Sequence, residues 1–454
     1  MSPFKIKYRW ADKVSLLMLL IAGLLIAHLI SVGRSVVKFS KPVELEYMGV
    51  RAAVPIGNGW ESDKQWAYEE NKFVLSSFFS PGQSSPIAVA HYRYLLGVVD
   101  VNASEQIQEK VLAVGGTISE EGTIKAGEVK IDWAQIKVPA TGARIGFGML
   151  FGCGVLPGSR VVNIEVRWSE QDAEEMAKKV FRRMARGLEF KGSSLLEDGA
   201  KIIRRMKEKG LGQFLTEQNR QNYFVIKDDK GKAVGYVINI FTDLGYEVPM
   251  NIQAASSSYI RGSHGREEVT IFQCRDDMSE FVYKSETVSR FGRSGIEGVF
   301  DRAGVLAVKE YGTFISGKGF RGADVEPYEE RFYRPGAASM PDILSELIYD
   351  ELLESEYGRI LIDVVRTDGT ILPVVISRVK GGDSNERKAA YAYELRLDFL
   401  DRQGSYSQVY LDKNKMTLKE IFHRGGTYVL ERSSPTELRK LIPEKSGEIF
   451  KYEK

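Results

Sequence analysis

"WSEQDAEEMAKKVFRRMARGLEF", residues 168–190, is the clearest secondary-structure signal in the chain. Ser169 is the expected N-cap, acidic residues follow it, and basic residues come later, as the helix dipole favours. Apolar residues recur at spacings of three and four, which places them on one helix face. They are Ala173, Met176, Ala177, Val180, Phe181, Met184, Ala185 and Leu188. The pattern predicts an amphipathic helix that packs on a sheet.

The sheet for this helix is expected from the segments that precede it. Apolar and β-branched residues are concentrated in segments separated by turn signals such as Thr141-Gly142 and Pro157-Gly158, which is typical of antiparallel strands. These segments are 48–56, 72–79, 85–99, 127–139, 143–156 and 159–168. A further helix is predicted at 102–116, ending at the Gly115-Gly116 pair. We therefore expect one α+β domain over residues 43–192, called the first domain below.

The order of these elements resembles the PsbP/Mog1-like fold. The features that carry the resemblance are an early P-x-x-x-x-W segment from Pro55 to Trp60, an internal helix, a long antiparallel meander and a C-terminal helix ending in GLEF. The resemblance covers residues 45–192. It implies the fold and an accessory or assembly role, and it supplies no catalytic residues.

A helical connector is predicted at 193–221, followed by an antiparallel β-rich domain at 222–454, called the second domain below. Turn dipeptides such as Asp368-Gly369 join sequential hairpins there. One helix, 339–355, is expected to cross the sheet. Its acidic residues could form a metal or acid/base cluster, but their spacing favours a solvated face; they are Asp342, Glu346, Asp350, Glu351 and Glu354. Residues 222–435 resemble, in element order, the LolA/LppX-like half-barrels that hold lipid or lipoprotein acyl chains.

The N-terminal region contains an apolar run from Val14 to Val32 without Asp, Glu, Lys or Arg. Its length is close to that needed to cross a hydrocarbon core of about 30 Å. It predicts a transmembrane anchor at 14–33 with the lipid bilayer as partner, a cytoplasmic tail at 1–13 and a juxtamembrane linker at 34–42. The protein would then be single-pass, with its bulk periplasmic or extracellular. A cleaved signal peptide is the alternative, and His28 is a candidate membrane or partner-helix contact.

Composition excludes several classes of function. Lys and Arg number 63 against 61 Asp and Glu, so no overall positive field attracts nucleic acid, which is not an expected partner. Two cysteines, Cys153 and Cys274, form no disulfide framework, although a single bridge between them stays open. Four histidines in the whole chain leave little for a zinc site. No metal and no cofactor is expected.

Weak motifs provide the catalytic candidates. SHGREE (263–268) lacks the second histidine of a zinc motif, and GRSGIEG (292–298) lacks the last glycine of a nucleophile elbow. Cys153 stands among glycines that could suggest a phosphate loop but occur within strand-like residues. An anchored hydrolase with Cys153 or a serine as nucleophile and His264 or His423 as base is therefore an alternative.

The expected function is that of a non-catalytic, membrane-anchored extracytoplasmic binding or assembly protein. The mixed aromatic and charged stretch 317–336 is a candidate protein-interaction surface, through Phe320, Arg321, Tyr328, Arg331, Phe332 and Tyr333. A lipid or lipoprotein carrier or sensor acting through the second domain is an alternative. It predicts an apolar pocket beneath the helix from Pro341 to Ser355.

Overall fold

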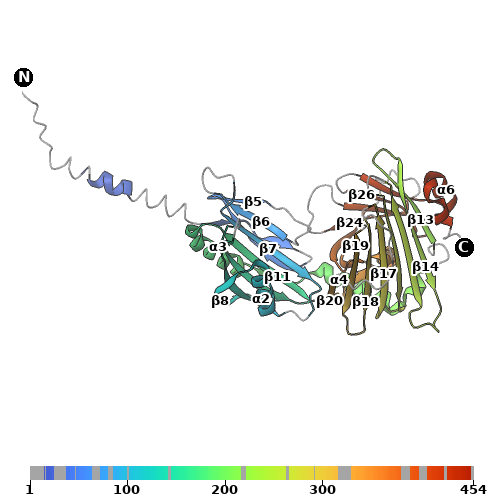
Figure 1. Cartoon of the computed structure of the whole chain (residues 1–454), viewed down its shortest axis with the longest axis horizontal. Helices are drawn as coiled ribbons and strands as arrows, with labels where there is room; N and C mark the ends of the chain where they lie inside the picture. The colour runs from blue at the N-terminus through green and yellow to red at the C-terminus, as the bar shows by residue number, and fades with distance from the viewer. Residues whose placement is uncertain are drawn as a thin grey trace, which may run out of the picture.

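The computed structural model describes most of the chain and places it in two sheet-based domains side by side (Figure 1). Strands hold 50% of the residues and helices 24%. The fold is therefore mostly β-sheet, which corrects the predicted α+β class. The described residues are 15, 17–24, 37–45, 48–63, 72–79, 85–99, 102–141, 145–215, 221–261, 265–290, 292–314, 329–379, 389–397, 406–423 and 427–450.

The predicted transmembrane anchor needs correction as well. Within the span 14–33, the described residues are 15 and the helical stretch 17–24. Among the described residues, none of the helices combines the length and the apolar character that crossing a bilayer requires. The structure therefore does not support the single-pass anchor or the placement deduced from it. The tail 1–13 and His28 lie outside the described residues.

The first domain is built on an antiparallel sheet whose described strands run in the order β5-β6-β7-β11-β10-β9-β8. Their bounds are β5 Trp60–Asp63, β6 Lys72–Phe78, β7 Ala88–Leu96, β8 Thr117–Ala126, β9 Val129–Val138, β10 Phe147–Leu156 and β11 Arg160–Trp168. Helix α2 (Ala103–Val114) covers one face and α3 (Glu174–Arg186) covers the other. Successive side chains of a strand point to opposite faces of the sheet. They therefore alternate between the core beneath α2 and the core beneath α3.

Helix α3 supplies the apolar face expected from the sequence. Val180, Phe181 and Met184 are buried, and the Phe181 ring lies 5.9 Å from that of Trp133 in β9. The predicted N-cap is wrong, because a 3₁₀ turn at Gln171–Ala173 precedes the helix. Ser169 instead donates a hydrogen bond to the carbonyl of Ile87 (3.3 Å).

Short strands flank this sheet near the start of the domain. They form a pair, β1 with β4, and a three-stranded sheet in the order β12-β3-β2. Their bounds are β1 Lys38–Phe39, β2 Val43–Leu45, β3 Val50–Ala52, β4 Pro55–Ile56 and β12 Glu189–Phe190.

The connector is helix α4 (Ser194–Lys209), followed by the 3₁₀ helix η3 (Leu211–Phe214). The Ser193 hydroxyl caps it by accepting from the Leu196 amide (3.2 Å). Ile202, Ile203 and Met206 are fully buried and belong to the core of the second domain. Helix α4 is thus a packed part of that core as well as a link between domains.

The second domain is one long sheet, of fifteen strands in the described residues, in the order β20-β19-β18-β17-β16-β15-β14-β13-β27-β26-β25-β24-β23-β22-β21. Their bounds are β13 Gln221–Lys227, β14 Ala233–Asp243, β15 Ile252–Ile260, β16 Arg266–Cys274, β17 Phe281–Ser289, β18 Gly292–Phe300, β19 Leu306–Phe314, β20 Glu329–Tyr333, β21 Ser339–Pro341, β22 Arg359–Val365, β23 Ile371–Arg378, β24 Tyr391–Leu397, β25 Tyr406–Leu411, β26 Thr417–His423 and β27 Thr427–Arg432. Two meanders join where β13 pairs with β27. All pairs are antiparallel except β21 with β22.

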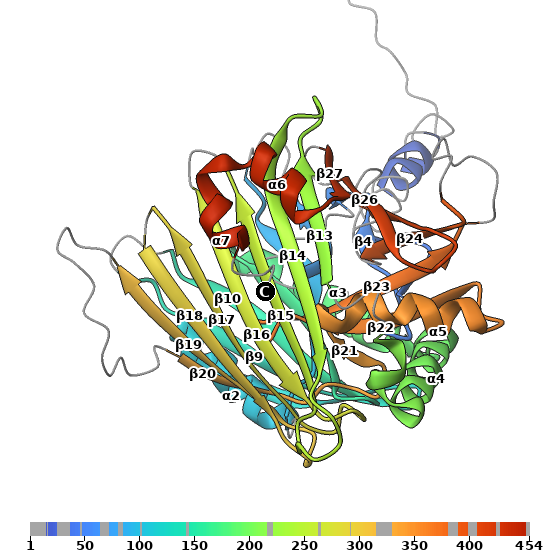
Figure 2. The same ribbon diagram turned by 90° about the vertical axis from the view of Figure 1, so that its right-hand side faces the viewer.

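The sheet curves around a short helical segment, the 3₁₀ helix η4 (Asp342–Leu347) continuing into α5 (Ile348–Glu354). Figure 2 shows the broad wall from β13 to β20, with α5 and β22 and β23 on the other side. Helices α6 (Pro435–Leu441) and α7 (Ser446–Phe450), with η5 (Pro443–Lys445) between them, cover the outer face of β13 and β14. The inner face of the curved sheet, which these helices do not cover, is therefore available to line a cavity.

The two domains are joined through a buried contact. The Arg160 guanidinium at the start of β11 donates to the Asp363 carboxylate in β22 (2.7 Å), and both side chains are about 95% buried. Nearby, the Arg334 amide donates to the Gly97 carbonyl (2.6 Å). Leu361 and Val375 of the second domain belong to the core that α3 covers. The domains therefore form one packed body.

Candidate functional site

A cavity of about 540 Å³ lies between η4 and the inner face of the curved sheet. Both meanders contribute, since Phe224 and Val237 line it from β13 and β14, and Leu395 and Val409 line it from β24 and β25. On β13 the next residue, Val225, packs outward against α6 and α7. The alternation of the strands thus assigns one set of side chains to the cavity and the other to the outer core.

The cavity has walls of different chemistry. An apolar wall comes from β22 to β24, through Ile362, Val364, Leu372, Val374, Ile376 and Leu395. A polar wall comes from β14 to β16, through Asn239, Ser256, Ser258, Glu268 and Thr270. The predicted pocket beneath the crossing segment is therefore present, but it is amphiphilic and not purely apolar.

Four carboxyl groups line this cavity: Glu268 on β16 is paired with Arg266 (2.9 Å), and the other three lie around the space beneath η4. Asp342 and Glu346 come from η4, and Glu420 comes from the opposite side, on β26. Burial raises the pKa of Glu346 to about 7 and that of Glu420 to about 8, and it also raises the pKa of Asp342. Among the described residues, no group of three or more His, Cys, Asp or Glu side chains is placed to hold a metal ion.

The surroundings of the three carboxyls differ. The Asn222 amide donates to Glu346 (3.4 Å), and the Arg432 guanidinium lowers the pKa of Glu346, although less than burial raises it. Around Glu420, the negative charges of Asp342 and Glu346 raise its pKa further, and the Ser407 hydroxyl partly opposes them. The cavity therefore concentrates acidic groups around Glu420.

A second hollow of about 480 Å³ continues along the inner face of β16 to β18. Glu268, Arg366 and Thr367 line both spaces, so the two are adjacent. Hydroxyl groups predominate farther along, and they belong to Ser285, Thr287, Ser289 and Ser294. The cavity thus opens into a polar groove.

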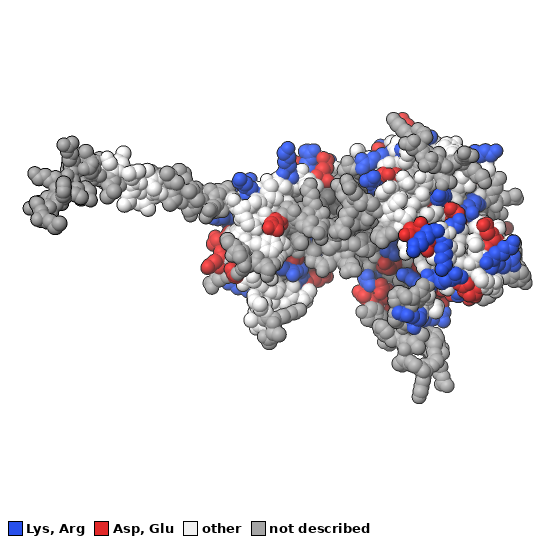
Figure 3. All heavy atoms as spheres, turned by 90° about the horizontal axis from the view of Figure 1, so that it is seen from above, with Lys and Arg blue, Asp and Glu red and all other residues white. Residues whose placement is uncertain are grey.

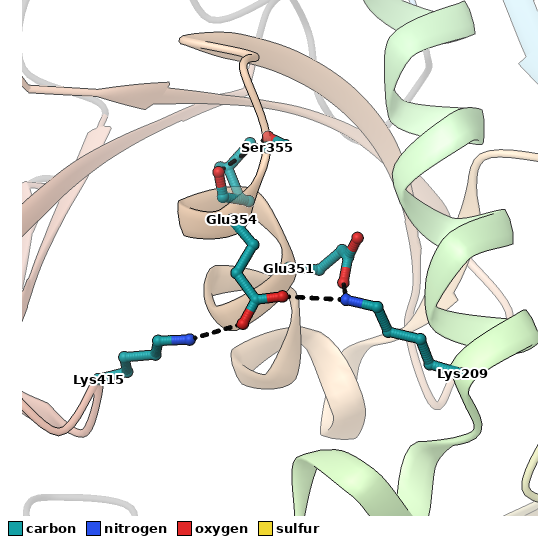
Figure 4. A network of polar contacts seen from close by, with 6 residues as sticks. Lys209, Glu351, Glu354, Ser355 and Lys415 are labelled. Atoms are coloured by element: carbon teal, nitrogen blue, oxygen red, sulfur yellow. Dashed lines mark hydrogen bonds and ion pairs between the residues drawn. The ribbon is translucent and has the colours of Figure 1, made fainter.

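Helix α5 is held in place by a lysine clamp at its C-terminal turn (Figure 4). Lys209, at the end of α4, contacts Glu351 (2.5 Å) and Glu354 (3.0 Å), and Lys415 contacts Glu354 from the β25–β26 turn (3.0 Å). Glu351 is buried, whereas Lys209 and Glu354 are partly exposed. The clamp ties the segment that roofs the cavity to both sides of the domain.

Lys209→Met is expected to destabilise the protein by about 1–2 kcal/mol, because it leaves Glu351 buried without its ammonium partner. The loss stays below that of a fully buried pair, since the Lys209 side chain is 39% exposed. Urea unfolding monitored by circular dichroism measures it. Lys201→Met, on the same helix, is the control, because its bridge to Asp198 (2.8 Å) is exposed at the lysine and should contribute little. Equal losses of stability in Lys209→Met and Lys201→Met would contradict a stabilising role for the clamp.

The acidic residues of the crossing segment form the solvated face that the sequence predicts only in part, since Asp342 and Glu354 are exposed and Glu351 is buried. Glu351 does not line the cavity. Asp342 and Glu346 do line it and are therefore candidate ligand contacts. The prediction assumed 3.6 residues per turn, but η4 is a tighter 3₁₀ helix and turns different residues inward. The sequence analysis does not identify Glu420 as a site residue. The signal that could have identified it is its spacing of two residues from Phe422, which places both side chains on the same face of the strand.

Of the catalytic candidates, the two described ones, Cys153 and His423, lie in different domains. Cys153 is a fully buried free thiol in the core beneath α2, and burial raises its pKa to about 12, which removes thiolate character at neutral pH. Cys274 is likewise free and buried in the other domain. His423 stacks on Tyr406 in the second domain, with ring centroids 4.5 Å apart. His264 lies outside the described residues.

The candidate interaction surface is described only in part. In β20, Phe332 is 56% exposed, Tyr333 packs against the core, and Arg331 is paired with Glu310 (2.6 Å) and Glu329. Phe320, Arg321 and Tyr328 lie outside the described residues. On the face shown in Figure 3, positive and negative side chains are interspersed over the second domain.

Comparisons with known proteins find low similarity to solved structures over part of the chain. No protein-family model and no curated protein matches the chain. A solution structure of the cyanobacterial PsbP (CyanoP) of Synechocystis is similar at 9% identity and a TM-score of 0.27, over 34% of this chain and 94% of that one. The Ran-binding protein Mog1p of Saccharomyces cerevisiae is similar at 12% identity and a TM-score of 0.27, over 35% and 97%. These similarities cover about a third of this chain, and TM-scores of this size do not assign it the PsbP/Mog1-like fold; a likeness of the second domain to LolA is not shown.

Proposed function

We propose that the protein is a non-catalytic binding protein whose second domain holds a small amphiphilic molecule in the cavity beneath η4. The observation that carries this proposal is the cavity itself, with an apolar wall on β22 to β24 facing a polar wall on β14 to β16. Its volume, about 540 Å³, lies within the range typical of small-molecule sites. The element order that resembles LolA/LppX-like half-barrels agrees with a role of this kind.

The cavity is tested with N-phenyl-1-naphthylamine, a neutral apolar dye that fluoresces when it leaves water. Wild-type protein is expected to bind the dye. Ser258→Trp, which projects an indole from the polar wall into the cavity, is expected to weaken binding by about tenfold or more, equivalent to at least about 1.4 kcal/mol. Fluorescence titration measures both affinities.

The matched control is Ile271→Trp, which adds the same indole to the outer face of β16, where Ile271 is 48% exposed. It should bind the dye as the wild type does. Urea unfolding shows whether both variants are folded. Absence of dye binding by the wild type, or equal affinity in all three proteins, would overturn the proposed function.

A further inference from the structure

The acidic side chains that line the cavity favour a positively charged ligand. Glu346 and Glu420 enter the cavity from opposite sides, on η4 and β26, with Asp342 beside them. Because like charges in a partly desolvated space oppose one another, Asp342 and Glu346 make ionisation of Glu420 unfavourable. Protonation of Glu420, or a cation bound beside it, relieves this repulsion.

Of the positive side chains near the cavity, Arg366 acts on Asp342, Arg432 acts on Glu346, and Arg396 is paired on its own strand. Arg396 forms an ion pair with Glu394 (2.6 Å) and lies over the Tyr406 ring (5.3 Å). Arg432 donates to the Asn222 side chain (3.1 Å), next to Glu346. Arg366 lines the cavity and lowers the pKa of Asp342. The charged groups that shift the pKa of Glu420 are Asp342 and Glu346, and none of these three arginines is among them.

Aromatic rings complete the lining around the carboxyls. Phe224, Tyr349, Tyr406 and Phe422 all face the cavity. Carboxylates combined with aromatic faces are the surroundings in which amines and quaternary ammonium groups are bound, through ion pairing and cation–π attraction. The apolar wall on β22 to β24 then remains available for a hydrocarbon portion.

We propose that the ligand of this cavity is a cationic amphiphile, whose ammonium group lies between Glu346 and Glu420 and whose apolar portion lies against β22 and β23. This assignment rests on the proposed binding function and narrows it to one chemical class. A ligand of this kind places a positive charge beside Glu420 and an apolar portion against the apolar wall. An anionic amphiphile is disfavoured, because its head group would face ionised carboxyls above about pH 8.

Proton release should accompany binding. The groups that face Glu420 are Asp342, Glu346, Tyr349 and the Ser407 hydroxyl, and those that face Glu346 also include Asn222, Asn239 and Arg432. The raised pKa values of about 7 and about 8 mean that both carboxyls are largely protonated near pH 6 and ionised near pH 9. Affinity for a permanent cation should therefore rise with pH across this window.

The test compares three amphiphiles with the same dodecyl chain, each below its critical micelle concentration, as competitors of the bound naphthylamine dye. They are dodecyltrimethylammonium, dodecyl maltoside and dodecyl sulfate. At about pH 9 the ammonium compound is expected to displace the dye about tenfold more effectively than the maltoside, and this advantage should shrink towards pH 6. Dodecyl sulfate should be the weakest competitor.

Glu420→Gln and Glu346→Gln should each remove most of the ammonium advantage over the maltoside and its pH dependence. Glu175→Gln, which removes an exposed carboxylate from the first domain, should behave as the wild type. If the dye binds but the three head groups compete equally, or the sulfate competes best, the cationic assignment is overturned while the binding cavity stands. If the dye does not bind at all, both proposals fail.

Discussion

Arg160→Met is expected to lower the free energy of unfolding by about 3–5 kcal/mol, because it leaves the Asp363 carboxyl buried at the domain junction without its partner. The two groups are 2.7 Å apart, and each side chain is 5% exposed or less. Calorimetry and urea unfolding measure the loss. Arg51→Met is the control, because the bridge from Arg51 to Glu44 is exposed and of similar length (3.0 Å); it should cost no more than about 1 kcal/mol.

The pH dependence of this variant gives a second, independent readout. Burial raises the pKa of Asp363, and Arg160 opposes that rise. Without Arg160, protonation of Asp363 removes the unpaired charge, so the stability deficit should shrink as the pH is lowered towards the pKa of Asp363. An Arg160→Met/Asp363→Leu double variant should recover much of the loss, since an apolar pair leaves no buried charge. A deficit that is independent of pH and of Asp363 would contradict the assigned pairing.

Gly199→Ala is expected to destabilise the protein by about 3 kcal/mol, although alanine is normally the better helix former. A Cβ at Gly199 in α4 would lie 1.9 Å from the Leu361 carbonyl oxygen of β22, and backbone cannot move aside as a flexible side chain does. Gly447→Ala is the matched control, because a Cβ on Gly447 in α7 meets nothing within 4 Å. It should be neutral or gain up to about 1 kcal/mol.

The Gly199 comparison is read from urea midpoints of the two variants and the wild type. Loss in Gly199→Ala with no loss in Gly447→Ala supports the close approach of α4 to β22. Because β22 carries Ile362 and Val364 of the apolar wall, the same variant should also bind the naphthylamine dye more weakly. Unchanged stability in Gly199→Ala would show that α4 does not pack on β22 as described.

Local patterns located much of the first domain. The three-and-four spacing around Val180 and Phe181 predicts the buried face of α3, because helix periodicity is a property of nearby residues. The helix start was wrong, since the 3₁₀ turn at Gln171–Ala173 and the Ser169 bond to Ile87 depend on a tertiary contact. In the second domain, the Asp368-Gly369 dipeptide lies at the β22–β23 turn for the same local reason.

Contacts between residues far apart in the sequence could not be predicted from local sequence patterns. Arg160 and Asp363 are 203 residues apart, and the pairing of β13 with β27 joins the two ends of the second domain. An apolar run alone was also insufficient, since the expected anchor at 14–33 is not supported by a helix of the required length and character among the described residues. The cavity carboxyls were misjudged because a 3₁₀ geometry at Asp342 and Glu346 cannot be read from spacing based on an α-helix.

The most direct test of the binding cavity is native mass spectrometry of the full chain, purified without detergent, followed by extraction of any bound molecule. The wild type is expected to carry a reproducible extra mass that extracts as an amphiphile with a basic nitrogen. The Ser258→Trp protein, whose cavity is filled, should lack it. A wild-type spectrum without any added mass, or the same added mass in both proteins, would contradict the account.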